Sequence, residues 1–261
     1  MAVLTLHIAH GDMEVPRLRA LGYDHVVPWR EALADGPVRP RSIDLVNLRR
    51  DFVERAYSSS AEEYDIAIVG VLEQIMSGTW KEVVLHFDKD LFCCVNFMFL
   101  VSVLGSVPRL VWDVGAAPFV LSTMDRAYIT SCWRAYASAD PRMLEDLILQ
   151  SPPSLIALTD ALRAHLVRFP STQSGYGRPQ ELVLEILDRG LTETEDLVQA
   201  FIALDQNVYG WGDVQIIRER KLASAIQAGH ATMDLGGLTQ TITGPHWQWD
   251  PLKQKLRWSE E

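Results

Sequence analysis

The first 113 residues alternate between two patterns of apolar positions. Short runs rich in β-branched side chains, which are typical of buried parallel strands, stand at residues 3–8, 25–29, 83–87 and 109–113. The longer stretches between them place apolar residues three or four positions apart, as an amphipathic helix does. Strands that alternate with helices predict an α/β fold with a Rossmann-like, mainly parallel sheet covered by helices.

Residues 91–104 form the longest nearly apolar run of the chain. The run is shorter than the roughly 20 residues that a helix needs to cross a bilayer. It therefore predicts a buried helix that ends at Gly105, and no membrane partner is expected.

The strand pattern then stops, and the middle of the chain is predicted to be helical. Residues 171–177 are polar and turn-forming and show no periodicity, which is typical of a linker. We therefore expect two domains, an α/β domain with a helical extension over residues 1–172 and a second domain over residues 173–261. Three helical segments followed by a hairpin around Gly236 predict a winged-helix-like α+β fold for the second domain.

The charge balance argues against nucleic acid as a partner. The chain has 24 Lys plus Arg against 34 Asp plus Glu, a net charge of −10, so it lacks the basic surface of a nucleic-acid-binding protein. Arg218, Arg220 and Lys221 stand on the predicted third helix of the tail, where a DNA-reading helix would lie. Residues 173–261 nevertheless contain 8 Lys plus Arg and 13 Asp plus Glu, a net of −5, which would repel a phosphate backbone.

Cysteine usage and the start of the chain indicate a cytoplasmic protein. The three cysteines, of which Cys93 and Cys94 are adjacent, cannot form a disulfide framework. No charged-then-apolar signal peptide precedes the first predicted strand. Cys93 and Cys94 fall at the N-terminal end of the apolar helix, where the helix dipole favours a thiolate. We interpret both as buried structural cysteines.

Acidic residues follow the predicted strands, and open parallel sheets bind ligands at the carboxyl ends of their strands. Gly11 permits a tight turn whose N–H groups could receive an anion, with Asp12 as a general base or metal ligand. Alternatively, Gly11 only makes a turn and Asp12 caps the next helix. The chain contains neither a G-x-G-x-x-G nor a G-x-x-x-x-G-K-[ST] motif, so dinucleotide and P-loop nucleotide sites are disfavoured.

Potential metal ligands follow the third predicted strand at alternate positions, which an extended backbone would present on one side. They are His86, Asp88 and Asp90. Together with His7, His10 and Asp12 they could hold a divalent Mn, Fe or Zn ion for phosphoester chemistry. Helix capping and salt bridges are the alternative for the same acids. Because the chain has no H-E-x-x-H motif and no facial-triad spacing, both metal and cofactor stay unassigned.

A turn-rich loop after the second predicted strand combines Trp29, Arg30 and Glu31. A flat indole and a bidentate guanidinium can stack on a base and bind a phosphate or carboxylate. The alternative is a Trp29 packed in the core and an Arg30 paired with Glu31 or Asp35. Both interpretations stay open at this point.

Three short motifs resemble those of a known bacterial family. They are, in chain order, His7-Ile8-Ala9-His10-Gly11-Asp12, Trp29-Arg30-Glu31 with Gly36-Pro37, and Asp88-Lys89-Asp90-Leu91-Phe92. The family is named domain of unknown function 1835, and the segment from Gly175 to Arg178 with the tail resembles its companion C-terminal domain. His10 stands where such sequences often have Asn, and Lys89 where they often have His. The resemblance implies the same two-domain fold and carries no established reaction.

We hypothesise a cytoplasmic hydrolase or transferase that binds a small anionic or nucleotide-like ligand at the strand ends. In this hypothesis Asp12, Asp88 and Asp90 supply the catalytic carboxylates. The ligand is bound by His7, Gly11, Trp29, Arg30 and Glu31. We expect these groups to surround one concavity.

The alternative hypothesis is a non-catalytic, ligand-sensing regulator whose C-terminal domain binds a partner protein or DNA. Trp247, Trp249 and Trp258 are spaced through polar residues of the tail. Because large aromatic side chains anchor interfaces, they are compatible with packing against the first domain or with a homodimer.

Overall fold

The structure, a computed structural model, describes residues 4–115 and 118–260. The chain divides into two units. The second unit comprises Asp35–Pro37, Asp90–Phe92 and the chain from Ala135 onward, and the first unit comprises the rest. The expected α/β class is confirmed, because helices accompany a mixed, mostly parallel sheet.

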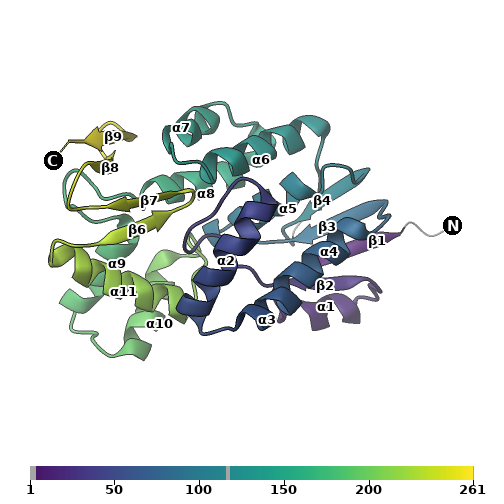
Figure 1. The fold of residues 1–261 in the computed structure, drawn as a ribbon, viewed down its shortest axis with the longest axis horizontal. Coiled ribbons are helices and arrows are strands. Elements are labelled where there is room, and N and C mark those ends of the chain that lie inside the picture. The colour runs from purple at the N-terminus through teal and green to yellow at the C-terminus, as the bar shows by residue number, and fades with distance from the viewer. Residues whose placement is uncertain (1–3, 116–117, 261) are drawn as a thin grey trace. The chain divides into compact units, whose positions relative to one another are not determined.

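The sheet of the first unit has five strands in the order β2-β1-β3-β4-β5 (Figure 1). Strands β1 to β4 pair in parallel, and the short β5 is antiparallel to β4. The strands are β1 Thr5–His10, β2 Val26–Trp29, β3 Glu82–His86, β4 Arg109–Asp113 and β5 Phe119–Val120. The helices up to α6 are α1 Glu14–Ala20, α2 Ser42–Tyr57, α3 Ala61–Tyr64, a π-helical turn Asp65–Val69, α4 Gly70–Ser77, α5 Leu91–Val103 and α6 Thr123–Tyr136.

Helices cover both faces of this sheet. Helix α1, between β1 and β2, packs through Leu18 on Ala9, whose side chain lies on one face. Helix α5, between β3 and β4, packs on the opposite face, where Phe97 stacks on Trp112 with 4.4 Å between ring centroids. The strand order therefore reverses between β1 and β3, and ligands bind at the carboxyl ends of the strands beside such a reversal.

Helix α5 is the buried apolar helix that the sequence predicts. Residues from Cys93 to Val101 are at most 2% exposed. All three cysteines are buried thiols, and burial raises the pKa of the Cys132 thiol to about 12. Within the described residues, no helix combines the length and the apolar character that a membrane crossing requires.

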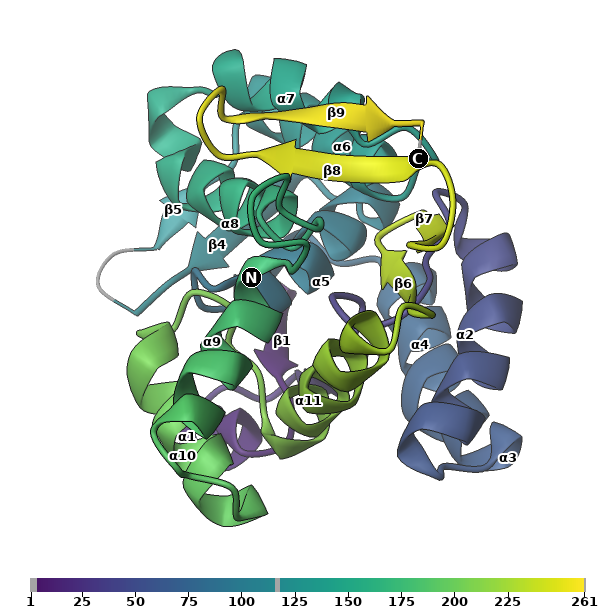
Figure 2. The ribbon, with the colours of Figure 1, turned by 90° about the vertical axis from the view of Figure 1, so that its left-hand side faces the viewer.

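The second unit is mainly helical and ends in two hairpins (Figure 2). The helices are α7 Arg142–Leu149, a 3-10 turn Pro153–Leu155, α8 Ile156–Leu166, α9 Arg178–Asp188, α10 Thr194–Asp205 and α11 Asp213–Gln227. The hairpin strands are β6 Thr232–Leu235, β7 Leu238–Thr241, β8 His246–Asp250 and β9 Lys255–Ser259. The expected hairpin around Gly236 is β6–β7. Strand β9 lies beside α7, where the Leu256 N–H donates to Glu145 Oε1.

The supposed linker at residues 171–177 lies inside the second unit. The N–H of Thr172 donates to the carbonyl oxygen of Trp249, and the N–H of Trp249 donates to that of Pro170, both at 2.9 Å. These bonds tie the segment to β8. The division between the units therefore falls near Ala135, whereas the sequence pattern places it after residue 172.

Candidate functional site

A pocket of about 420 Å³ lies at the carboxyl ends of β1, β3 and β4. The strand order reverses there, and open parallel sheets bind ligands at such a position. Its volume suits a small molecule. The lining comes from the strand ends, from α1 and from the loop after β4: His10, Met13, Glu14, Arg17, His86, Phe87, Asp88, Asp113, Val114 and Gly115.

His86 is the centre of a polar chain across three strands. Its Nδ1 lies 3.0 Å from Asp113 Oδ2 on β4, and its Nε2 lies 2.9 Å from Nδ1 of His7 on β1. The strand register explains these contacts, because His86 is directly opposite both Asp113 and Ala9, and His7 shares a face with Ala9. The ring of Tyr23 stacks on His7 with 3.8 Å between centroids.

The imidazoles of His7 and His86 are both neutral at neutral pH. Burial and the neighbouring His86 lower the pKa of His7 to about 4. Burial also lowers the pKa of His86, although the Asp113 carboxylate opposes that shift. With its proton on Nδ1, facing the Asp113 carboxylate, His86 would accept the Nδ1–H of His7 at Nε2. Within the described residues, Nε2 of His7 makes no hydrogen bond. Of the groups in the row Asp113–His86–His7, it is therefore the one nitrogen that can still accept a hydrogen bond.

The pocket carries charged groups of both signs. Arg17 Nε donates to both carboxylate oxygens of Glu14 at 2.8 and 2.9 Å, which lowers the pKa of Glu14. Asp113 Oδ1 accepts the N–H of Gly115 at 2.9 Å, so the backbone helps to hold this carboxylate in place. The lining contains one cation, Arg17, and three acids, Glu14, Asp88 and Asp113. Its formal charge is therefore −2 before histidines are counted.

Three potential metal ligands meet beside the pocket. His10 at the end of β1, Asp88 after β3 and Cys93 in the first turn of α5 each offer one ligand atom, and these atoms lie within 4.8 Å of one another. Cys93 is 1% exposed. His10 and Asp88 are predictable from the sequence as potential ligands. Cys93 is not, because the turn from β3 into α5 brings it to them.

Asp12 and Arg30 form an ion pair with each other. Arg30 Nε donates to Asp12 Oδ2 at 2.8 Å and its Nη2 to Oδ1 at 2.7 Å, and these bonds lower the pKa of Asp12. Neither side chain is among the described lining of the strand-end pocket. The N–H of Gly11 donates to the carbonyl oxygen of Trp29 at 3.0 Å, and its φ of +74° makes the expected tight turn.

Trp29 and Glu31 lie in the core. Trp29 is 2% exposed, and its Nε1 donates to Oδ1 of Asn96 at 2.9 Å. Glu31 accepts two bonds from Arg49 at 2.9 and 2.8 Å and one from the Tyr64 hydroxyl at 2.7 Å. The Arg49 and Glu31 side chains are 0% and 2% exposed, so this ion pair is a buried structural contact.

Asp90 belongs to the second unit, where its carboxyl group packs against Gly210. A Cβ built on Gly210 would lie 2.3 Å from Asp90 Cγ, and the φ of Gly210 is +66°. Of the catalytic and ligand-binding residues expected from the sequence, Asp88 lines the strand-end pocket in the described part of the chain. His10 and His86, expected as potential metal ligands, line it too, and His7 is connected to it through His86.

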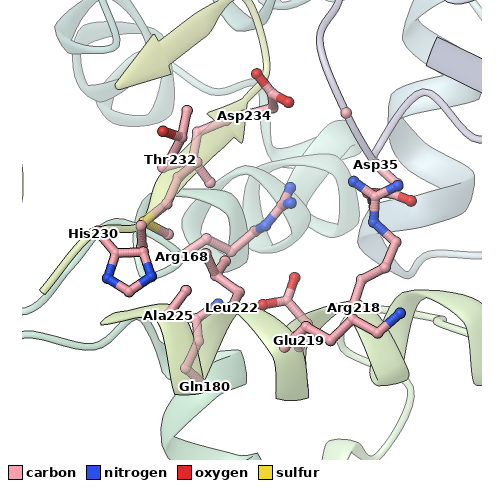
Figure 3. Close-up of a pocket in the computed structure, with 15 residues that line it drawn as sticks. Asp35, Arg168, Gln180, Arg218, Glu219, Leu222, Ala225, His230, Thr232 and Asp234 are labelled. Atoms are coloured by element: carbon pink, nitrogen blue, oxygen red, sulfur yellow. Dashed lines mark hydrogen bonds and ion pairs between the residues drawn. The ribbon is translucent and has the colours of Figure 1, made fainter. Parts of the chain in front are cut away.

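A second cavity, of about 380 Å³, lies within the second unit. Arg218 and Glu219 rise from α11 into it, and Arg168 enters the same space from the segment after α8 (Figure 3). Arg218, a candidate for DNA contact in the sequence, lies 3.5 Å from Asp35, and Arg220 donates to the carbonyl oxygen of Thr192 at 2.9 Å.

Glu219 is a buried acid in this cavity and was not anticipated from the sequence. It is 9% exposed, and its Oε2 accepts a hydrogen bond from Gln180 Nε2. Burial raises the pKa of Glu219 to about 7, against the opposing influence of Arg168. The Gly177 N–H donates to Gln180 Oε1 at 2.8 Å and so fixes the orientation of the amide.

Comparisons of the chain with protein-family models, with curated proteins and with solved structures found no match. The function is therefore inferred from the geometry of the site.

Proposed function

We propose that the protein is a hydrolase or transferase that binds a small anionic or nucleotide-like ligand in the strand-end pocket. The observation that carries this proposal is the presence of Arg17, His86 and Asp113 around one pocket of about 420 Å³. A cation and groups able to move protons, gathered where the strand order of a parallel sheet reverses, are typical of an α/β active site.

Arg17 is the proposed anion contact. Its side chain is 57% exposed at the pocket and is paired with Glu14, which is on the same helix. An exposed pair of this kind is held by little free energy. The guanidinium can therefore exchange the Glu14 carboxylate for a phosphate or carboxylate of the ligand, with the same bidentate geometry.

Asp113 is the proposed general base. His86 and the Gly115 N–H hold its carboxylate at the pocket, which gives it a defined orientation. In a hydrolysis it would accept a proton from water as the water oxygen attacks the ligand. The proposed base is thus Asp113 rather than Asp12, because Arg30 occupies both carboxylate oxygens of Asp12.

The finer fold assignments are part of this proposal. The parallel order β2-β1-β3-β4, with helices on both faces, supports a Rossmann-like first domain. Helices α9, α10 and α11 followed by the β6–β7 hairpin support a winged-helix-like fold in the second unit. Both agree with the resemblance to the domain of unknown function 1835 family. Three buried thiols are compatible with a cytoplasmic location.

Ligand sensing without catalysis is a second candidate function, favoured by the cavity of the second unit. Glu219 and Arg168 offer a buried acid and a buried cation to a small ligand there. DNA is not proposed as a partner, because the tail carries net negative charge. A homodimer is compatible with either function, since Trp258 is 48% exposed beside Trp247.

Ligand binding by paired variants tests the leading proposal. Thermal melting with inorganic phosphate and with adenosine monophosphate should show a ligand-dependent rise for wild type and for Arg19→Gln. Arg17→Gln should lose that rise, because Arg17 lines the pocket whereas Arg19 is an exposed residue of the same helix. Equal rises in both variants, or none in wild type, would reject the proposed site.

Turnover separates the enzyme from the sensor. Mass spectrometry of adenosine monophosphate and of simple phosphoesters after incubation should show conversion by wild type. Asp113→Asn should retain binding and lose conversion, because the amide cannot accept the proton. Binding without conversion in wild type would favour the sensor.

A further inference from the structure

We propose that His10, Asp88 and Cys93 bind a zinc ion beside the strand-end pocket. The proposal rests on the proposed function of that pocket, to which it adds a resident divalent cation. The three ligand atoms come from the ends of β1 and β3 and from the first turn of α5, and they lie within 4.8 Å of one another.

The donor set selects the metal. Imidazole nitrogen, thiolate sulfur and carboxylate oxygen are the three ligand types that Zn²⁺ uses in proteins. Mg²⁺ and Ca²⁺ prefer oxygen ligands throughout, so a cysteine and a histidine among three ligands disfavour them. Three protein ligands with a fourth position open to water or substrate is the arrangement of catalytic zinc sites.

The three ligand atoms need to move only slightly closer together to bind zinc. Tetrahedral ligands at about 2.0–2.3 Å from zinc lie roughly 3.4–3.7 Å apart, whereas the atoms here lie within 4.8 Å. His10 and Cys93 stand on a strand and a helix, which hold them in place. Asp88 is exposed in the loop after β3, so its side chain can rotate toward the other two ligands.

The charge of the pocket also favours a cation. Its lining has a formal charge of −2 before histidines are counted, which opposes the entry of an anionic ligand. A divalent ion at His10 and Asp88, which themselves line the pocket, offsets part of that charge, since the Cys93 thiolate adds one negative charge of its own. A zinc ion held there with an open position would be able to bind water or an oxygen atom of the ligand.

Cys93 can supply the thiolate. It lies in the first turn of the 13-residue helix α5, and a bound zinc ion favours the deprotonated form of a cysteine ligand. The adjacent Cys94 is equally buried, but its Sγ lies 3.4 Å from the Lys89 carbonyl oxygen and 4.0 Å from that of Asp88. Cys94 is therefore a matched control on the same turn of helix.

Cobalt substitution tests the thiolate ligand directly. The full chain, stripped of metal with a chelator, is titrated with Co²⁺. Wild type should bind one equivalent and show a thiolate-to-cobalt charge-transfer band together with the strong visible bands of tetrahedral cobalt. Zn²⁺ should displace the ion. Cys93→Ser should lose the charge-transfer band, whereas Cys94→Ser and Cys132→Ser should retain it.

The other two ligands are tested by affinity. Asp88→Asn and His10→Gln should each weaken Co²⁺ binding by about 100-fold or more, because even partners of metal ligands cost about 10–100-fold when removed. Asp12→Asn, an exposed strand-end acid outside the cluster, should bind like wild type. A wild type without the charge-transfer band, or a band that persists in Cys93→Ser, would overturn the proposal. If Cys93→Ser fails to fold by circular dichroism, the exposed Asp88→Asn variant decides, and unchanged affinity there rejects the site.

The zinc site and the ligand pocket can fail separately. Phosphate and adenosine monophosphate are titrated calorimetrically into metal-free and zinc-loaded protein. Zinc binding with the expected variant pattern, but no anion binding, supports the zinc site and rejects the proposed function. Anion binding that is equal with and without zinc, in a protein that lacks the cobalt charge-transfer band, rejects the zinc site and leaves the proposed function standing.

Discussion

Replacing Glu219 with Gln is expected to change how stability depends on pH. Glu219 is 9% exposed in the cavity of the second unit and accepts a hydrogen bond from the Gln180 amide. Glutamine keeps the shape of the side chain and an acceptor for that amide, and it removes the ionisable group. Burial raises the pKa of Glu219 from 4.5 to about 7, so the folded protein binds this proton more tightly than the unfolded chain does.

The sign and size of the effect follow from that shift. An acid whose pKa is raised on folding contributes its full stability below its unfolded pKa and loses it as the pH rises. The loss begins near pH 4.5 and is complete above pH about 7. One pKa unit corresponds to about 1.4 kcal/mol. Relative to wild type, Glu219→Gln should therefore gain about 3 kcal/mol in unfolding free energy as the pH rises through this window.

Urea unfolding of both proteins across this pH range measures the difference. Histidines with lowered pKa values, such as His7 and His165, destabilise both proteins at acidic pH and cancel in the subtraction. Glu185→Gln is the control, because Glu185 is an exposed partner of Arg189 on α9. Its difference from wild type should stay within about 1 kcal/mol at every pH.

A constant difference between Glu219→Gln and wild type would refute the reasoning, since it would mean an ordinary pKa for Glu219. A difference of opposite sign would show that Arg168 keeps the carboxylate ionised and that its attraction exceeds the cost of burial.

Three further predictions concern the structural assignments. Arg49→Met should lower the unfolding free energy measured in urea by about 3–5 kcal/mol, because it leaves Glu31 buried and unpaired. Arg30→Met should lower it by at most about 1 kcal/mol. Equal losses in the two variants would contradict this contrast. The His7 imidazole should titrate near pH 4 when followed by NMR. The stability that the neutral His7 contributes is therefore lost as the pH falls from 6.5 toward 4. A titration near pH 6.5 would contradict its burial. Gly210→Ala should lower stability by more than about 1 kcal/mol in melting or urea experiments, because φ is +66° and Asp90 fills the space; an unchanged midpoint would show that Asp90 moves aside.

The strands and many of the helices were predictable because the signals for them are local. A parallel strand buried on both faces must be a short apolar run, and residues 109–113 match β4 residue for residue. The predicted third helix of the tail, which carries Arg218, Arg220 and Lys221, is likewise present as α11. The β8–β9 hairpin was missed, because its tryptophans alternate with polar residues and were interpreted as interface anchors.

The partners of the polar side chains could not be predicted in the same way. Glu31 pairs with Arg49, which is 18 residues away, rather than with its neighbour Arg30. Asp113 meets His86 because β3 and β4 pair in one particular register. A shift of one residue would turn these side chains to opposite faces of the sheet. Spacing along the chain identified residue types able to do chemistry, but it did not identify which of them meet.

The location of the domain division is also a tertiary property. Residues 171–177 have the composition of a linker, and composition reports only what a segment does in isolation. In the folded chain their backbone groups bond to β8, so they lie inside the second unit. Local sequence determined that this protein is α/β and where its strands end, because periodicity and turn chemistry act over a few residues. Long-range hydrogen bonds and strand register decided which of those ends form a pocket.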